Sequence, residues 1–255
     1  MLVFKTIAVA FSMFSSLPMP HIEWDKDNMR YSLCAFPAIG ALIGLVCWAA
    51  SAVLGRLGIP SLLLAAVLTA IPVLITGGIH IDGYADTSDA LASHAEIEKK
   101  HEILKDPHVG SFAVIRICIY FILTFALWAS LPEYRPVHLL LCFVLSRALS
   151  GLAVTIFPLA KNSGLAYTFA EASDKKRASL ILFILSAVIS TLLCICGLEG
   201  IGMAAAAWVV FGYYHAMSRR QFGGLSGDLA GWFLSVSELW MLAALVAVQY
   251  IELLF

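Results

Sequence analysis

The feature that most restricts the fold of this chain is a series of about eight apolar stretches, each about 17 to 24 residues long. A helix rises about 1.5 Å per residue, so about 20 apolar residues cross the hydrocarbon core of a bilayer. Of the 255 residues, 61% are hydrophobic and only 13% are charged, whereas a soluble domain carries about 25% charged residues. We therefore predict an all-α, polytopic membrane helix bundle that forms a single domain over residues 1–255. The expected spans are 1–17, 32–54, 60–79, 112–131, 137–158, 178–198, 201–217 and 232–255.

Basic residues are distributed unequally between the connections that join these stretches. If every stretch crosses, one side carries eleven of the 16 lysines and arginines, and the other side carries three. Such an excess is typical of the cytoplasmic side, so both chain ends are expected outside the cytoplasm. The long connections also lie on the basic side, where we expect the chemistry. The eleven residues are Lys26, Arg30, Lys99, Lys100, Lys105, Lys161, Lys175, Lys176, Arg177, Arg219 and Arg220.

The net charge of the chain is close to zero, at -1. No long-range field therefore attracts nucleic acid, and no nucleic acid is expected as a partner. The six cysteines lie within apolar runs and lack the paired spacing of metal ligands, so we interpret them as small packing residues. Any polar ligand must then be held by local groups of residues.

Three aspartates follow the third apolar stretch. Asp82, Asp86 and Asp89 are separated by four and three residues, so at about 100° per residue they share one stripe of a helix. Neighbouring carboxylates repel each other unless a cation lies between them, and hard oxygen ligands suit Mg²⁺ or Mn²⁺. Gly77 and Gly78 precede them and would let a phosphate or a neighbouring backbone come close.

A simpler interpretation is that acidic residues at the start of a helix favour its dipole and face water. It accounts for one or two aspartates, but less well for three on one stripe in a chain with so few charges. We therefore favour a metal site. His80 stands two residues before Asp82, and the roles of base and phosphate donor both stay open for it.

Two later connections carry further candidate ligands. Lys105 and Asp106 precede a turn that leads into a span, where a cation can meet a phosphate and a carboxylate can meet a metal. A glycine-rich loop before the last span could hold an anion through its backbone N–H groups. The candidates in this loop are Gly223, Gly224, Ser226 and Asp228.

Two ionisable residues, Arg147 and Glu238, fall within expected spans. Such residues are costly in lipid and usually face a polar cavity or each other. A structural pair between them and a substrate contact by Arg147 are both consistent with the sequence.

Taken together, these groups resemble the cobalamin synthase family, the adenosylcobinamide-GDP ribazoletransferases. The resemblance runs over nearly the whole chain and rests on three blocks in order. Ala90, Ala92 and Lys161 depart from the pattern, where the family often has glycines and an arginine. The blocks are Gly77-Gly78-Ile79-His80-x-Asp82-Gly83-x-Ala85-Asp86-x-x-Asp89, Lys105-Asp106-x-x-Val109-Gly110-Ser111-Phe112 and Gly223-Gly224-x-Ser226-Gly227-Asp228-x-x-Gly231.

The resemblance implies a Mg²⁺-dependent phosphotransferase of cobalamin biosynthesis. It would transfer the adenosylcobinamide phosphate group of adenosylcobinamide-GDP to α-ribazole or its 5′-phosphate and release GMP. Its partners would be the corrinoid nucleotide, α-ribazole and the lipid bilayer, and a homo-oligomer stays open. We expect an integral protein of the cytoplasmic (inner) membrane whose active site faces the cytoplasm.

The same resemblance gives each candidate residue a role. Asp82 and Asp86 would bind Mg²⁺ on the diphosphate, Asp89 would act as metal ligand or base, and His80 is a further catalytic candidate. Asp106 and Asp228 would complete the carboxylate ring. The expected substrate contacts are Lys105, Gly223, Gly224, Ser226 and Arg147.

Two other functions remain open on the sequence. One is a transferase like the CDP-alcohol phosphotransferases, although their motif has an arginine soon after Asp-Gly-x-x-Ala, where this chain has Asp86. The other is a cation transporter, although an ion path would continue through the spans, and Glu238 is the only carboxylate found away from their ends.

Overall fold

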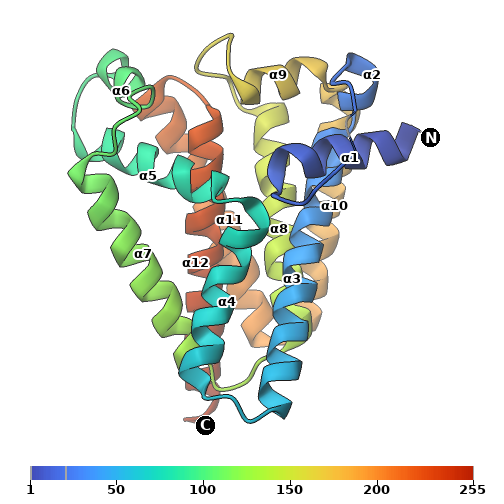
Figure 1. The fold of residues 1–255 in the computed structure, drawn as a ribbon, viewed down its shortest axis with the longest axis vertical. Coiled ribbons are helices and arrows are strands. Elements are labelled where there is room, and N and C mark those ends of the chain that lie inside the picture. Colours follow the sequence, from blue (N-terminus) through green and yellow to red (C-terminus); the bar gives the residue numbers. More distant parts are fainter. Residues whose placement is uncertain (1, 21, 255) are drawn as a thin grey trace.

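The computed structural model describes residues 2–20 and 22–254, and these form helices and connections without a β-strand. Figure 1 shows the long helices side by side, with α2, α6 and α9 gathered at one end, which we call the upper end. The helices are α1 (Leu2–Phe14), α2 (Lys26–Met29), α3 (Ser32–Arg56), α4 (Ser61–Thr76), α5 (Ile79–Ala92), α6 (Ile97–Ile103), α7 (Ser111–Ser130), α8 (Pro136–Ile156), α9 (Leu165–Ala172), α10 (Lys175–Ile195), α11 (Leu198–Phe222) and α12 (Gly227–Glu252).

The predicted all-α membrane bundle is confirmed, but eight spans are not. In the described residues, five helices are long and apolar enough to cross a membrane, namely α3, α7, α8, α10 and α12. The count becomes six if α4 and α5, which are bent by 94°, are taken as one span. The helix α11 has 25 residues and packs against α10 and α12, but it is less apolar than these five.

The first expected span is the clearest departure from the prediction. The helix α1 has 13 residues, so it is about 20 Å long, which is too short for a hydrocarbon core of about 30 Å. It lies across the bundle near the upper end, while α12 ends at the opposite end (Figure 1). The described helices therefore do not support α1 as a span, on which the expectation of both chain ends on one side depended.

The centre of the bundle is α8, whose residues are buried without interruption from Leu141 to Val154. It packs against α3 on one side and α10 on another, and α12 also contacts it. An apolar surface all around a helix is typical of a helix surrounded by others. The outer helices α7 and α10 instead expose large apolar side chains, as a surface facing lipid requires.

A sharp turn between α4 and α5 brings the acidic segment to the upper end. Gly77 and Gly78 have φ values of 64° and 82°, a left-handed conformation that side chains with a Cβ disfavour. Two such residues in succession turn the chain by 94°, so α5 lies across the long helices near the upper end (Figure 1). The glycine pair thus makes the turn that positions the aspartates.

The helix α5 crosses the start of α12 at very short range. A Cβ atom on Gly83 would lie 2.7 Å from the Asp228 carbonyl oxygen, and one on Gly231 would lie 2.9 Å from the His80 carbonyl oxygen. Only glycine allows this approach of the two backbones. The contact joins the first and third sequence blocks. The close backbone approach expected at Gly77 and Gly78 is not found there, because an added Cβ on Gly78 would meet nothing within 4 Å and one on Gly77 would meet only the Ser16 Cβ, at 3.4 Å.

Candidate active site

Three carboxylates gather where α5 crosses α12. Asp82 is exposed, while Asp86 and Asp228 are half-buried. Burial and the negative charges of Asp82, Asp228 and Asp89 raise the pKa of Asp86 to about 6. Burial and the negative charge of Asp82 raise the pKa of Asp228 above its ordinary value. The structure therefore brings together carboxylates that are 142 to 146 residues apart in the chain.

These carboxylates fit a divalent ion that is shared with a substrate. In residues 2–20 and 22–254, no group of three or more Asp, Glu, His or Cys side chains could hold a metal by itself. Mg²⁺, however, is usually bound by one or two carboxylates together with phosphate oxygens and water. Among the described residues, no ion pair involves Asp82, Asp86 or Asp228. A bound cation would therefore offset the repulsion between these three carboxylates.

Asp89 and Asp106 were expected to belong to one ring of carboxylates, but both form hydrogen bonds to other groups. Asp89 acts on Asp86 by its charge, but its Oδ1 accepts a hydrogen bond from the Ala113 N–H, at 3.3 Å, near the start of α7. Asp106 is exposed and accepts hydrogen bonds from the N–H and Nδ1 of His108, at 3.0 and 2.7 Å. Within the described residues, Asp106 makes no contact with the three carboxylates, so the structure does not support its place in that ring.

A basic cavity of about 210 Å³ lies next to Asp228. Lys105 and Lys161 line it, together with Ser226 and the first turn of α12. Burial and the charge of Lys105 lower the pKa of Lys161, and neither lysine forms an ion pair among the described residues. Two uncompensated cations beside a helix N-terminus make a favourable site for a phosphate group.

The helix α6 holds one side of the basic cavity. Its Lys100 donates a hydrogen bond to the Gln221 side chain, and the Nε2 of His101 lies 2.9 Å from the Phe222 carbonyl oxygen. These contacts fix α6 to the end of α11. Lys105 follows α6 after one residue, Leu104. The sequence identified Lys105 as a phosphate ligand, but it treated Lys161 only as a departure from the family pattern. The available signal was a lysine two residues before Ser163-Gly164.

The glycine-rich loop has a structural role in place of the expected anion cradle. The N–H groups of Gly223 and Gly224 donate to the carbonyl oxygens of Arg219 and Ser218, at 3.2 and 3.0 Å. They are therefore not free for a substrate, and the structure does not support backbone contacts at these two glycines. Ser226 caps α12 by accepting a hydrogen bond from the Leu229 N–H at 3.3 Å.

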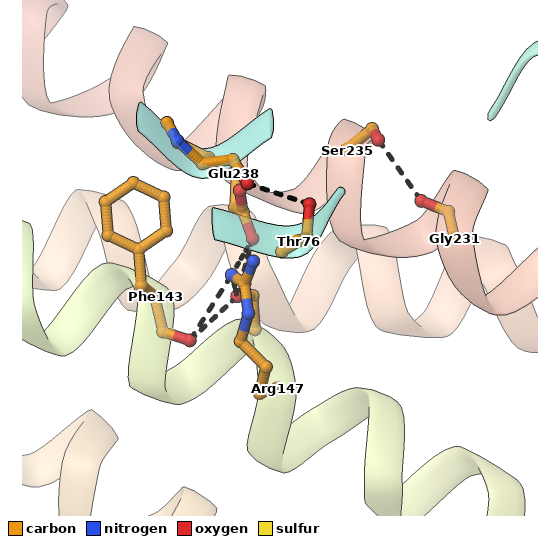
Figure 2. A network of polar contacts seen from close by, with 8 residues as sticks. Thr76, Phe143, Arg147, Gly231, Ser235 and Glu238 are labelled. Atoms are coloured by element: carbon orange, nitrogen blue, oxygen red, sulfur yellow. Dashed lines mark hydrogen bonds and ion pairs between the residues drawn. The ribbon is translucent and has the colours of Figure 1, made fainter. Parts of the chain in front are cut away.

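Arg147 and Glu238 form the buried pair that the sequence left open (Figure 2). Arg147 is 1% exposed, and its Nη1 also donates to the Ser146 Oγ at 2.8 Å. The Ser146 hydroxyl in turn donates to the Glu238 carboxylate at 3.0 Å. Arg147 lines neither the basic cavity nor the cavity beside Asp82. It lines a smaller cavity of about 40 Å³ together with His80 and Glu238, so the ion pair is present and a substrate contact by Arg147 stays a prediction.

His80 is buried directly behind Asp82, at 9% exposure. Its ring meets the edge of the Phe36 ring, with 5.8 Å between the centroids. Its Nε2 has no hydrogen-bond partner among the described residues. The catalytic role considered for His80 stays a prediction, because the ring is held away from water.

The bundle and its site define an integral membrane protein that presents acidic and basic groups together at one end. Residues 6–246 match the family model described as cobalamin-5-phosphate synthase, and the chain belongs to this family. The expected resemblance is thereby confirmed.

Several relatives match the chain over nearly its whole length, and each is named adenosylcobinamide-GDP ribazoletransferase. One from Lachnoclostridium phytofermentans is 44% identical over 237 residues, covering 92% of this chain and 90% of the relative. One from Clostridium botulinum is 32% identical, covering 92% and 94%. One from Pseudomonas fluorescens is 34% identical, covering 90% and 94%. No solved structure matches the chain.

Proposed function

We propose that the protein is an adenosylcobinamide-GDP ribazoletransferase. It would join adenosylcobinamide-GDP to α-ribazole or its 5′-phosphate and release GMP. The observation that carries this proposal is that Asp228, which lies near Asp82 and Asp86, also lines the basic cavity. The family match of this bundle spans residues 6–246. The same match favours this function over a CDP-alcohol phosphotransferase or a cation transporter.

In the proposed reaction, a ribose hydroxyl oxygen of the acceptor forms a bond to the phosphorus that carries the corrinoid. The bond from this phosphorus to the GMP oxygen breaks, and the hydroxyl proton leaves with a base or water. Such transfers depend mainly on the position of the reactants and on neutralised charge. Asp228 lines both the basic cavity and a neighbouring cavity that Asp82 also lines, so a donor and an acceptor could approach each other there.

In this proposal, the basic and the acidic residues of the site have different roles in binding the diphosphate. Lys105, Lys161 and the first turn of α12 would bind its oxygens in the basic cavity. Asp82, Asp86 and Asp228 would hold Mg²⁺, and Asp89 stays a candidate for metal ligand or base. When bound, the ion would neutralise charge that builds up on the phosphate oxygens.

We further propose that the upper end faces the cytoplasm of a cell whose inner membrane contains the protein. The basic connections between the long helices lie at this end, whereas Arg56 and Arg135 lie at the other (Figure 1). Lys5, on α1, also moves to the upper end because α1 does not cross. The excess of lysine and arginine residues at the upper end is therefore larger than the sequence alone indicated.

The proposed activity is tested with the purified full chain in lipid nanodiscs. We expect GMP to form in equal amounts with the joined corrinoid product, only when adenosylcobinamide-GDP, α-ribazole and Mg²⁺ are all present. Removal of Mg²⁺ with a chelator should abolish the reaction, and added Mg²⁺ should restore it. GMP release that does not need α-ribazole, or CMP release from a CDP-alcohol, would contradict the proposal.

The close helix crossing gives a further prediction. Gly83→Ala places a methyl group 2.7 Å from the Asp228 carbonyl oxygen, so α5 must move away from α12. Overpacking of this kind costs about 1–3 kcal/mol, and we expect the rate of GMP formation to fall at least about tenfold because the carboxylates separate.

The matched control is Gly212→Ala in α11, where an added Cβ meets no atom within 4 Å. It should change neither the rate nor the amount of protein in the membrane. Equal rates for Gly83→Ala and Gly212→Ala, at equal membrane content, would show that the crossing does not position the site.

A further inference from the structure

A second cavity, of about 300 Å³, lies on the other side of Asp228 from the basic cavity. Residues of α1, α3, α5, α8, α9 and α12 enclose it. Leu165, Ala166, Gly227 and Asp228 line both cavities, so the two meet between the start of α9 and the first turn of α12. We call it the aromatic cavity because Phe14, Phe36 and Phe169 line it.

The three phenylalanines come from three helices and form one wall. The Phe14 ring lies 4.5 Å from the Phe36 ring and 5.2 Å from the Phe169 ring, measured between centroids. Phe36 and Phe169 are 3% and 2% exposed. The end of α1 that carries Phe14 is fixed by Ser16, whose N–H donates to the Ile75 carbonyl oxygen at 2.8 Å. Such a wall favours a flat ring, which it can contact by stacking or edge to face.

The opposite part of the cavity is polar. Asp82 and Asp228 line it where it approaches the basic cavity. His80 lines both this cavity and the smaller cavity beside Arg147, and the buried Nε2 of this side chain has no partner among the described residues. A buried nitrogen without a partner is costly, and a ring nitrogen of a bound heterocycle would satisfy it. The cavity thus offers an apolar aromatic surface, one unpaired nitrogen and carboxylates close together.

We propose that the aromatic cavity binds the base of the acceptor nucleoside, an inference that rests on the proposed function. The base lies against Phe14, Phe36 and Phe169, and a ring nitrogen pairs with His80. The ribose then points to Asp82 and Asp228, so its hydroxyl meets the diphosphate in the basic cavity. Phe169 and Val154 are specificity-determining residues of this site.

The lining also sets which bases are accepted. Apart from His80 and the two aspartates, Ser150 is the only polar side chain among the described residues that line the cavity. The exocyclic amino and carbonyl groups of purines would be buried there without partners. The site should therefore favour a benzimidazole base over adenine attached to the same ribose.

The test compares Phe169→Leu with Phe157→Leu. Both replace a buried phenylalanine, but Phe157 packs against Phe211 and Tyr214, outside the aromatic cavity. We expect Phe169→Leu to raise the KM for α-ribazole about fivefold, with the KM for adenosylcobinamide-GDP changed less than about twofold. Phe157→Leu should leave both values as in the wild type. Val154→Phe, which fills the cavity, should raise the KM for α-ribazole at least about tenfold.

Binding of α-ribazole, measured by calorimetry on the same proteins in nanodiscs, gives a second readout that does not need turnover. If the wild type forms GMP but the two leucine variants shift both KM values alike, the base site is wrong while the proposed function stands. If no GMP forms but Phe169→Leu still weakens α-ribazole binding, the base site stands and the proposed function fails. Unchanged α-ribazole affinity in Val154→Phe, as when a lipid tail fills the cavity, overturns the inference.

Discussion

Asp86→Asn is expected to lower the rate of GMP formation about a thousandfold or more, and Asp82→Asn should have a similar effect. The amide has nearly the same shape as the carboxylate but lacks the charge that holds a hard cation near the diphosphate. In phosphoryl transfer, loss of a group that neutralises the transferred phosphate is typically this costly. The rate is measured at saturating substrates and Mg²⁺.

The same substitution should stabilise the metal-free protein. The pKa of Asp86 lies near 6, above its usual value, so ionisation opposes folding and its cost appears as pH rises from about 4 to 6. Asp86→Asn removes that cost, so we expect a higher Tm at pH 7 without metal. Added Mg²⁺ should raise the Tm of the wild type more than that of the variant.

The control for both measurements is Glu102→Gln on α6. Glu102 pairs with Lys99 at 2.7 Å, and both side chains are largely exposed, so the pair contributes little. This variant should keep wild-type turnover and the wild-type response to Mg²⁺. Near-normal turnover in Asp82→Asn and Asp86→Asn, with normal membrane content, would refute the assignment of the metal site.

The second large effect is expected at the buried ion pair. Arg147→Met leaves the Glu238 carboxylate buried without its cation (Figure 2). Breaking a buried pair on one side typically costs about 3–5 kcal/mol, whereas replacing both members with apolar residues is often neutral or stabilising. We expect a large fall in Tm for Arg147→Met and recovery of most of it in Arg147→Met/Glu238→Leu, measured by thermal unfolding in one detergent.

The double variant also separates the two roles that the sequence allowed for Arg147. If Arg147 acts only through the pair, the KM for both substrates should stay within about threefold of the wild type. If the double variant is stable but its KM for adenosylcobinamide-GDP is strongly raised, the result would instead support a direct contact between Arg147 and the substrate. Equal instability of the single and double variants would show that the pair is not the source of the effect.

The all-helical bundle could be predicted because apolar length alone decides which segments enter a membrane. The first stretch could not be assigned in this way. Its apolar residues continue to Leu17, but the helix ends at Phe14, before Ser15, Ser16 and Pro18. The fold of this part depends on contacts of Ser16 with the end of α4, which are invisible in a hydropathy pattern.

The sequence predicted which residue types form the site better than it predicted how they are arranged in space. Helical spacing placed Asp82 and Asp86 correctly on one helix, and the three blocks of motif residues drew attention to Asp228. Spacing could not show that Asp89 turns toward α7, or that Asp106 pairs with His108. Nor could it distinguish a glycine that contacts a ligand from Gly83, which lets two helices touch. Such distinctions depend on which distant segment fills the neighbouring space.

The position of α1 has a practical consequence for work with this protein. Because α1 lies at the upper end and α12 finishes at the far end (Figure 1), the proposed orientation predicts that fusions before α1 and after α12 emerge on opposite faces of the bilayer. Under the proposed function, an affinity tag placed after α12 would lie on the face away from the site, whereas one placed before α1 would lie on the face where the corrinoid nucleotide binds. A fluorescent reporter that matures only in the cytoplasm should accordingly glow on one terminus and stay dark on the other.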